Sequence, residues 1–437
     1  MSDSLPRVLG RFDLISLTLG SVIGSGIFIV PAFVFTQTGG HLGTALFVWT
    51  AGGVLSLLGA LTYAELAAMK PESGGIYVYI RDAFGGFTAF LYGWAVFLVI
   101  GSATVATLAV AFSSYLQELV PLSAPAAKAV AVGMIAVLAL VNVTGTRRSA
   151  NLQNWTTAAK VGAILVMSAL LIAGGGMARE AEVRLPGPDS ALLLGVGAAM
   201  VGVLWAYEGW HFVTFSAGEV IEPQRNFPRG IVIGTAALIA IYLLANVAYV
   251  AALGMPRSMA SERIASEAVS AVLGPGAARL VAIAILVSMF SAANATILTA
   301  TRVYYAMAKD GVFFKRMAAI HPGWKTPAFA IIASCAWAAL LAVSGTFEEL
   351  LTYVIFVGWA FYALGAASVF RYRRTAPDAP RPFRVPGYPW TPWLFVGIGA
   401  AVVVNTVWLH PARAAIGFGL VALGVPVYRF WKRRTST

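Results

Sequence analysis

Long, continuous runs of apolar residues set the narrowest limit on what this chain can fold into. A helix needs about 20 predominantly apolar residues to cross a lipid bilayer. We predict twelve such spans, at residues 14–37, 44–69, 86–116, 126–144, 151–173, 192–218, 230–254, 275–303, 327–344, 348–370, 391–408 and 415–431. Strands of a membrane barrel would alternate apolar and polar residues over about ten positions. The continuous runs therefore predict an all-α integral membrane protein.

Charged residues are too scarce for a soluble domain, and their positions predict an orientation. They make up 11% of the sequence, against about 25% in soluble proteins. If the N-terminus is cytoplasmic, 22 of the 30 Lys and Arg residues face the cytoplasm, seven face outward, and Lys160 lies within a span. Because Lys and Arg favour cytoplasmic loops, we expect a multi-pass protein of the cytoplasmic (inner) membrane with both termini inside. The net charge of +12 is then a topology signal, and we expect no nucleic-acid partner.

The first apolar run carries its own helix breaker. It contains "GSVIGSGIF" at residues 20–28, with three glycines and two serines. An orphan backbone group costs several kcal/mol in hydrocarbon, so an interruption survives only where its freed groups face protein, water or a ligand. Close helix packing through Gly20 and Gly24, which form a GxxxG pair, is an alternative reading of these glycines.

A second interruption lies in the sixth span. The stretch "GVLWAYEGWHFVTFSAGE", residues 202–219, places Glu208 and Gly209 in mid-span. Paired interruptions at matching positions of two halves point to the binding site of a transporter. Freed N–H groups and the positive end of a half-helix attract a carboxylate, and freed carbonyls accept from an ammonium. A zwitterionic α-amino acid carries both groups.

Four stretches resemble the amino acid–polyamine–organocation superfamily, within it the L-type amino acid transporter-like branch. They are "GSVIGSGIF", "YAELAAMKPESGGIYVYI", "WAYEGW…GEVIEPQRNFPRGI" and "NATILTATRVYYAMAKDG…HPGWKTP", in the family's order over nearly the whole chain. The resemblance implies the leucine-transporter fold, with twelve transmembrane helices, 5+5 inverted repeats and broken helices 1 and 6. The organisation expected from it is a cytoplasmic N-terminus at 1–13, a first repeat at 14–173, an extracellular loop at 174–191, a second repeat at 192–370, a cytoplasmic loop at 371–390, spans 11 and 12 at 391–431, and a cytoplasmic C-terminus at 432–437.

The same resemblance implies a set of substrate contacts. The carboxylate would bind the backbone N–H groups of Ser25 and Gly26. The α-amino group would bind the carbonyls of Val22, Trp205 and Glu208. The Trp205 ring would also cap the substrate from outside, with ordinary interface packing as the alternative. Asn294 matches a pocket position in span 8.

Three ionisable residues lie deep in the spans. Lys160 is near mid-membrane in span 5; the resemblance implies that its ammonium replaces a coupling sodium ion and holds carbonyls near Gly20 to Gly24, although snorkelling to the inner interface is an alternative. Glu208 stands where neutral amino acid exchangers commonly carry a small residue. Either it pairs with a cationic substrate, or it carries a proton, or it pairs within the protein. His211 follows three residues later and could share its helix face, most simply as a hydrogen-bonded core histidine.

Three further ionisable residues, Glu65, Glu219 and Arg302, lie near the cytoplasmic ends of spans. We expect them, with Trp205 on the other side, to act as gates, with interfacial snorkelling as the alternative for the ion pairs. Animal members of the branch bond to a heavy chain through a cysteine outside span 3. The single cysteine here, Cys335, lies elsewhere, so we expect no disulfide-linked heavy chain.

The function predicted is secondary active transport of L-amino acids by alternating access, either as a sodium-independent exchanger or as a proton-coupled carrier. Neutral substrates are expected, and Glu208 leaves an extension to cationic ones open. A basic amino acid or polyamine antiporter is the alternative within transport. A membrane-embedded transferase would need a catalytic constellation, and the four histidines are scattered. A channel would need a selectivity-filter loop. We expect no enzyme activity, no cofactor and no metal.

Overall fold

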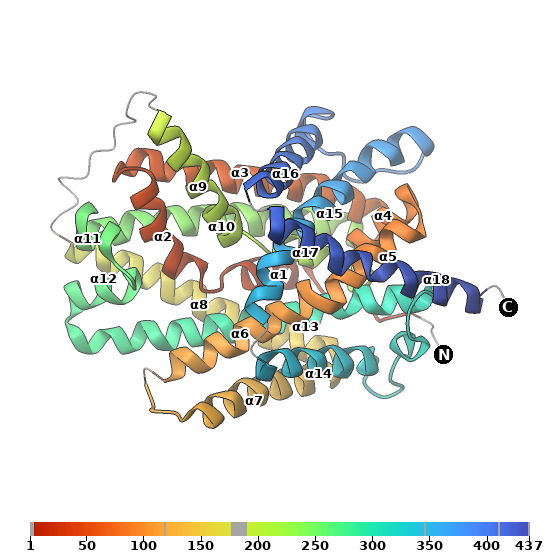
Figure 1. Ribbon diagram of the computed structural model, residues 1–437, viewed down its shortest axis with the longest axis horizontal. Helices are drawn as coiled ribbons and strands as arrows, with labels where there is room; N and C mark the ends of the chain where they lie inside the picture. The colour runs from red at the N-terminus through yellow and green to blue at the C-terminus, as the bar shows by residue number, and fades with distance from the viewer. Residues whose placement is uncertain (1–3, 118, 176–189, 345–346, 410, 436–437) are drawn as a thin grey trace.

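In the computed structural model, the described part of the chain is all-helical (Figure 1). The structure describes residues 4–117, 119–175, 190–344, 347–409 and 411–435. Most of the predicted extracellular loop at 174–191 lies outside these residues. The one β-type contact among them is an isolated parallel bridge between Leu9 and Val220. The all-α prediction is confirmed.

The helices follow the twelve predicted spans. In chain order they are α1 (Arg11–Val22) with α2 (Gly26–Gln37), α3 (Leu42–Met69), α5 (Gly86–Ala95) with the π-helical turn η1 (Val96–Ile100) and α6 (Gly101–Leu116), α7 (Ala124–Val143), α8 (Thr146–Gly174), α9 (Ser190–Ala206) with η3 (Trp210–Glu219), α10 (Pro223–Leu253), η4 (Pro275–Ala277) with α13 (Ala278–Lys309), α14 (Ala328–Ser344), α15 (Phe347–Thr375), α16 (Trp390–Leu409), and α17 (Pro411–Ala422) with α18 (Gly424–Thr435). Predicted ends differ from observed ends by a few residues in most spans. The largest differences are at α8, α10, α13 and α15, which extend beyond the apolar runs with polar turns.

Short helices outside the spans were not predicted. They are α4 (Ile76–Phe84), α11 (Met255–Ala260), α12 (Ile264–Leu273) and the 3₁₀ turn η5 (Lys315–Ala318). Figure 1 shows α11 and α12 at one end of the molecule and α4 at the other, with both chain termini. Termini at one end agree with an even number of crossings.

The two interrupted spans are broken where the sequence carries glycine. The axes of α1 and α2 differ by 52° across the residues between them. In the sixth span, α9 ends at Ala206, Gly209 adopts a φ of +114°, and the chain continues as the 3₁₀ run η3. Only glycine adopts that φ without strain, so the predicted helix at 192–218 is divided at this residue.

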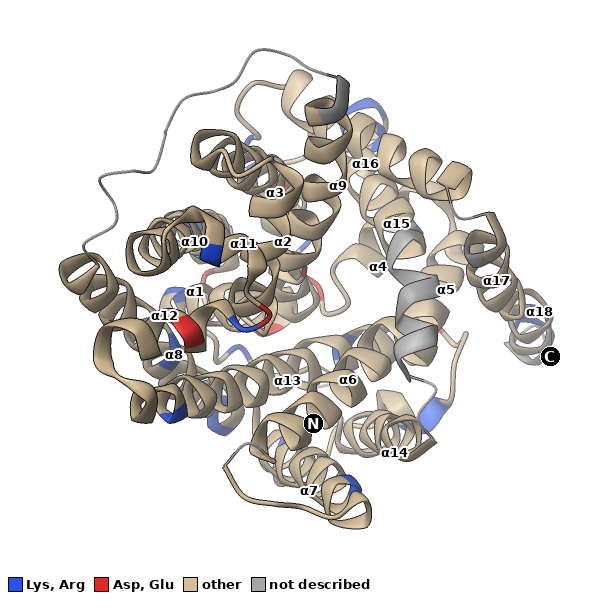
Figure 2. Cartoon of the chain, turned by 60° about the vertical axis from the view of Figure 1, so that its left-hand side comes forward, with Lys and Arg blue, Asp and Glu red and all other residues tan. Residues whose placement is uncertain are grey.

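The first span is the centre of the bundle. Seen from the end opposite the termini, α1 and α2 lie inside a ring that includes α3, α6, α8, α10 and α13 (Figure 2). Charged residues are sparse along these helices in the same view. Large apolar side chains such as Leu194, Trp155 and Trp408 are more than three-quarters exposed on the outer surface. Such a surface is stable in lipid and not in water, which agrees with membrane embedding.

Candidate substrate site

The break between α1 and α2 leaves backbone donors free. Among the described residues, no acceptor bonds the N–H groups of Ser25, Gly26 or Ile27. These groups form the first turn of α2, where no intrahelical acceptor exists. Together with the positive end of the helix dipole, they make a site for a carboxylate.

The carbonyls freed by the same break are almost all bonded by the protein. Lys160 Nζ donates to the carbonyls of Gly20 (2.8 Å) and Ile23 (2.5 Å). Ser288 Oγ of α13 donates to Ile23 (2.8 Å) and Gly24 (3.1 Å). The hydroxyl of Tyr242 in α10 lies 3.3 Å from the Val22 carbonyl. Three helices therefore hold the inner half of the break.

Lys160 is enclosed at the middle of α8. The 29-residue helix begins at Thr146, before the predicted start at 151, and Lys160 is only 1% exposed. Its amino group is directed to the α1 carbonyls and not along its stem to the interface.

The glycines of the first break have different surroundings. A Cβ on Gly20 would collide with the Gln153 side chain of α8, and one on Gly26 would lie 3.1 Å from Ala206 Cα and Cβ. A Cβ on Gly24 would meet only the Val22 carbonyl, at 3.9 Å. The packing alternative therefore describes Gly20 and Gly26, whereas Gly24 borders open space.

The second break is bonded to the first. Ser21 Oγ donates to the Gly209 carbonyl at 3.0 Å, and the Tyr242 hydroxyl donates to the Ala206 carbonyl at 3.0 Å. The Trp205 carbonyl accepts from the Glu208 N–H at 3.1 Å. Within the described residues, the Glu208 carbonyl has no donor.

The two breaks face each other across a cavity of about 140 Å³. Its walls come from residues of both breaks together with side chains of η1 and α6, α13 and α15. They are Ser21, Val22, Gly24, Ser25, Gly26, Ile100, Thr104, Thr107, Leu108, Ala111, Trp205, Ala206, Glu208, Gly209, Phe212, Ala292 and Tyr362. Of the six predicted substrate contacts, Val22, Ser25, Gly26, Trp205 and Glu208 line this cavity.

Glu208 brings a carboxyl group to the cavity wall. The Tyr362 hydroxyl of α15 donates a hydrogen bond to it, and its side chain is 26% exposed. His211 Nε2 lies 4.0 Å from Glu208 Oε1, too far for a hydrogen bond, and that nitrogen is buried with no hydrogen-bond partner among the described residues. The Tyr362 and His211 rings are in contact, with centroids 4.0 Å apart.

Trp205 forms part of the cavity wall and is 40% exposed. Its ring therefore lies between the cavity and open surface, while the neighbouring Ala206 and Tyr207 are buried.

Asn294 does not line the cavity, which differs from the sequence prediction. Its side chain is fully buried and bonded to α7 and α8: it donates to Gln153 Oε1 (2.9 Å) and accepts from Asn142 Nδ2 (2.9 Å) and Ser149 Oγ (3.1 Å). The α13 residue at the cavity is Ala292. Asn294 is two residues further along the helix, a rotation of about 200°, so its side chain points to the opposite interface.

A buried ion pair joins η3 to α13. Arg302 Nε lies 2.5 Å from Glu219 Oε2, and both side chains are fully buried. Thr146 Oγ1 donates to Glu219 Oε1 at 2.8 Å. The Glu219 carbonyl accepts from the N–H groups of Val8 and Leu9. This cluster joins η3, α13, α8 and the N-terminal segment.

A second polar cluster anchors the start of α1 at the same end. The two terminal nitrogens of Arg147 donate to the Asp13 carboxylate at 2.7 Å each. Asn154 donates to the same carboxylate at 2.6 Å. Together with the Glu219 cluster, it ties the inner half of the first span to α8.

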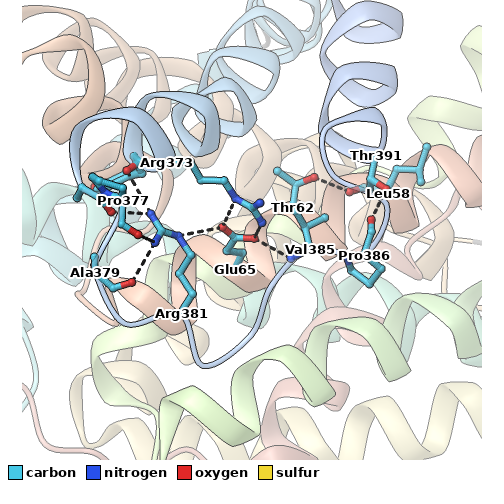
Figure 3. Close-up of polar contacts among 12 residues, drawn as sticks. Leu58, Thr62, Glu65, Arg373, Pro377, Ala379, Arg381, Val385, Pro386 and Thr391 are labelled. Carbon is cyan, nitrogen blue, oxygen red and sulfur yellow. Dashed lines mark hydrogen bonds and ion pairs between the residues drawn. The ribbon is translucent and has the colours of Figure 1, made fainter.

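Glu65 does not pair with Glu219 or Arg302, which corrects the expectation that the three form one set of ion pairs. It bonds Arg373 Nε at 2.9 Å and lies 3.6 Å from Arg381 Nε (Figure 3). Its partners come from the end of α15 and the loop that follows. The pairing involves residues some 300 positions apart, which the local pattern of charges could not indicate.

Several residues of the site were not predicted. Ser288, Tyr242 and Tyr362 are uncharged, and hydroxyl groups are common in apolar spans, so no pattern distinguishes them before their partners are known. The described residues contain no group of three or more His, Cys, Asp or Glu arranged to hold a metal ion.

Comparisons with known proteins agree with this geometry. A family model described as amino acid permease matches residues 9–428. The chain is 32% identical over 436 residues to the "Large neutral amino acids transporter small subunit 2" of Rattus norvegicus, covering 97% of this chain and 80% of that protein. It is 29% identical to the "Serine/threonine exchanger SteT" of Bacillus subtilis, over 100% and 99% of the two chains. It is 34% identical over 394 residues to the "b(0,+)-type amino acid transporter 1" of Homo sapiens, covering 88% and 80%.

Proposed function

This chain belongs to the amino acid permease family, and from that premise we propose that it exchanges L-amino acids across the cytoplasmic membrane, without sodium, by alternating access. That it is a multi-pass membrane transporter of amino acids with the leucine-transporter fold follows from its family. The division into inverted repeats at 14–173 and 192–370, the binding residues and the coupling are our proposals.

The free N–H groups of the α2 first turn carry the proposal. Ser25 and Gly26 line the cavity and have no acceptor in the described part of the chain. A substrate carboxylate bonded to them would gain charge-assisted hydrogen bonds, which are about twice as strong as neutral ones. Inside the membrane no bulk water satisfies these groups, so their exposure to a cavity favours an anionic ligand group.

The α-amino group would bind carbonyls of both breaks. The Glu208 carbonyl has no donor among the described residues, and the Val22 and Trp205 carbonyls keep a second lone pair each. All three residues line the cavity. A ligand with a carboxylate and an ammonium on one carbon bridges the two breaks.

Sodium independence is supported by the position of the Lys160 ammonium. It already donates to two carbonyls freed by the first break, where a sodium ion would need oxygen ligands. The amino group of Lys160 therefore occupies the place that the ion would take. We propose that Lys160 replaces a coupling sodium ion at this site.

The size of the cavity and the Glu208 side chain bear on the substrate class. A volume of about 140 Å³ suits compact side chains, and two similar proteins are named for serine/threonine and large neutral amino acids. Glu208 adds an acid on the wall. We propose neutral substrates as the main class, with Glu208 accepting cationic side chains or a coupling proton. The same carboxylate supports the alternative of a basic amino acid or polyamine antiporter.

The proposed orientation has both termini and the loop at 371–390 in the cytoplasm. Its support is the bias of 22 Lys and Arg residues against seven and the placement of both termini at one end of the bundle (Figure 1). We also propose that no disulfide joins this chain to a heavy chain, because Cys335 is its only cysteine and is buried. We assign transport alone to the site, with no catalytic step.

Exchange in proteoliposomes tests the proposed function. Uptake of labelled serine or leucine should accelerate several-fold when the lumen contains unlabelled amino acid, and choline should replace sodium without loss. Loading with an amino acid that does not compete for uptake provides the control. The proposal would be contradicted if uptake required sodium, or if neither internal amino acid nor a proton gradient changed its rate.

Cysteine labelling tests the orientation. In a Cys335→Ser background, an impermeant thiol reagent added to intact cells should label Glu262→Cys, between α11 and α12. It should not label Arg384→Cys, in the loop between α15 and α16, until the membrane is opened. The reverse pattern would refute cytoplasmic termini.

A further inference from the structure

A second cavity, of about 590 Å³, opens at the end of the bundle that carries the termini. It lies between α3, the beginning of α10 and the loop that joins α15 to α16. Its walls include Leu61, Arg225, Arg229, Val232, Ile233 and Phe383. None of these residues belongs to the substrate cavity.

The loop wall of this cavity is held in place by Glu65. Its buried carboxylate accepts from Arg373 and from the backbone N–H of Val385 at 2.7 Å, and pairs with Arg381 (Figure 3). Beyond Val385, Thr391 Oγ1 donates to the Pro386 carbonyl (Figure 3). The loop residues that face α10 are thus fixed before any ligand binds.

Two arginines on one face of α10 give the cavity its charge. Arg225 and Arg229 are four residues apart, which places them one above the other on a helix. Both are exposed, and within the described residues neither guanidinium has a hydrogen bond or an ion pair. The nearest acid along the sequence is Glu222, which is exposed and makes no ion pair with either arginine. Glu65, the other acid near this wall, is occupied by Arg373 and Arg381.

The remaining wall is apolar and continues the same helix face. Val232 and Ile233 follow Arg229 by one turn toward the membrane interior, and Ile233 is 46% exposed. Leu61 and Phe383 line the opposite side. A ligand that satisfies the whole cavity needs an anionic group at one end and a hydrocarbon segment at the other.

Exposed tryptophans place this cavity at the membrane surface. Trp390 and Trp393, at the start of α16, are 72% and 56% exposed. Tryptophans of this kind concentrate at the level of the lipid headgroups. They follow directly after the loop that lines the cavity, so we expect the two guanidiniums at headgroup depth and Ile233, two turns of helix beyond Arg225, at the depth of the acyl chains.

We propose that this cavity binds an anionic phospholipid. The phosphate bonds to Arg225 and Arg229, since guanidinium forks match phosphate geometry, and an acyl chain lies along Val232, Ile233 and Leu61. Basic pockets between helices on the cytoplasmic side are suited to anionic headgroups. The Glu65 network acts as the support of the site and does not touch the lipid.

Native mass spectrometry of the full-length protein in neutral detergent tests the proposal. Phosphatidylglycerol and phosphatidylcholine with identical acyl chains are titrated separately, and bound fractions give the affinities. The wild type should prefer phosphatidylglycerol. Each arginine removed should weaken its binding about fivefold, so Arg225→Gln with Arg229→Gln should weaken it about twenty-five-fold.

Arg11→Gln with Arg148→Gln is the matched control. Both residues are exposed and lie outside this cavity. Their substitution removes the same charge from the same end of the bundle. The control pair should keep wild-type phosphatidylglycerol affinity, and both pairs should melt as the wild type does without lipid. Equal loss in the two pairs, or no loss in either, would overturn the site.

Two further arms distinguish the source of the phosphate. Inorganic phosphate, compared with chloride at equal ionic strength, should not displace phosphatidylglycerol, because it offers no hydrocarbon. Complete displacement would show a free-phosphate site and refute the lipid. If the wild type binds phosphatidylcholine as tightly as phosphatidylglycerol, the cavity does not select an anionic headgroup, and the proposal is wrong.

Discussion

The two helix breaks differ in what bonds their freed backbone groups. At the first, Lys160 and Ser288 supply donors to the carbonyls of residues 20, 23 and 24, and the Tyr242 hydroxyl lies 3.3 Å from that of Val22. At the second, the Glu208 carbonyl has no donor in the described residues. The Glu208 side chain lines the cavity, and the His211 ring is buried behind it.

The difference suggests that the first break binds what all amino acids share and that the second break selects among them. The first break is held by protein contacts to most of its carbonyls, so its N–H groups are the main groups left for a ligand, and every amino acid has a carboxylate for them. The second break carries two ionisable side chains, Glu208 and His211. We therefore expect it to distinguish one substrate from another. The comparison predicts that changes at the first break abolish transport of all substrates, whereas changes at the second redistribute it.

Lys160→Met should give the largest effect. It leaves the buried Gly20 carbonyl without a donor, at about 1–3 kcal/mol, while the Ile23 carbonyl keeps its bond from Ser288, so uptake of every substrate should fall about tenfold to a hundredfold. Ser288→Ala is the milder control, because Ile23 keeps its bond to Lys160. Uptake in proteoliposomes, with melting of the purified protein, checks both. Wild-type uptake by the methionine variant would show that the ammonium is dispensable.

Gly26→Ala and Gly24→Ala form the next test, within the first break. The added methyl at Gly26 meets Ala206 at 3.1 Å, so the backbone there must shift by a few tenths of an ångström, and overpacking of this kind costs about 1–3 kcal/mol. Both melting temperature and uptake should fall. At Gly24 the methyl has room but enters the cavity, so melting should be unchanged while KM rises. Equal melting of the two variants would remove the distinction between packing and binding glycines.

Glu208→Gln tests the second break with little change of shape. If the acid binds a cationic side chain, the variant should lose about tenfold or more in lysine and arginine competition and keep neutral substrates. If it carries a proton, exchange should persist while acceleration by an inward proton gradient disappears. Competition and gradient assays on one preparation separate these results. Wild-type behaviour in both would leave the Tyr362 hydrogen bond as a structural contact only.

His211→Phe should have the smallest effect. A phenyl ring keeps the contacts with Tyr362 and Phe212 and removes a buried nitrogen that has no partner in the described residues. Uptake should stay within about twofold and melting should be unchanged or slightly raised. A loss of proton-driven uptake with unchanged melting would assign proton transfer to the histidine, and would place it with Glu208 in selectivity.

Much of the fold could be predicted because bilayer constraints act on contiguous residues. Span length, the absence of strands and the two breaks depend on runs of about 20 residues and on glycine within them. Helix ends were less accurate where polar turns extend a helix beyond the hydrocarbon, as in α8, which begins at Thr146. The short helices α11 and α12 lie outside the apolar runs and had no such signal.

The sequence alone also identified the side chains that are unusual at their depth, Lys160 and Glu208, because a charge in a span is conspicuous without knowledge of its neighbours. The tertiary structure alone decided which groups meet. It placed Asn294 among α7 and α8 and not at the cavity, gave Tyr362 to Glu208, and paired Glu65 with Arg373 instead of with the Glu219 cluster. The physical reason is that composition and periodicity are properties of neighbouring residues, whereas a hydrogen bond between helices depends on rotation and translation of elements more than a hundred residues apart, which only the packed bundle fixes.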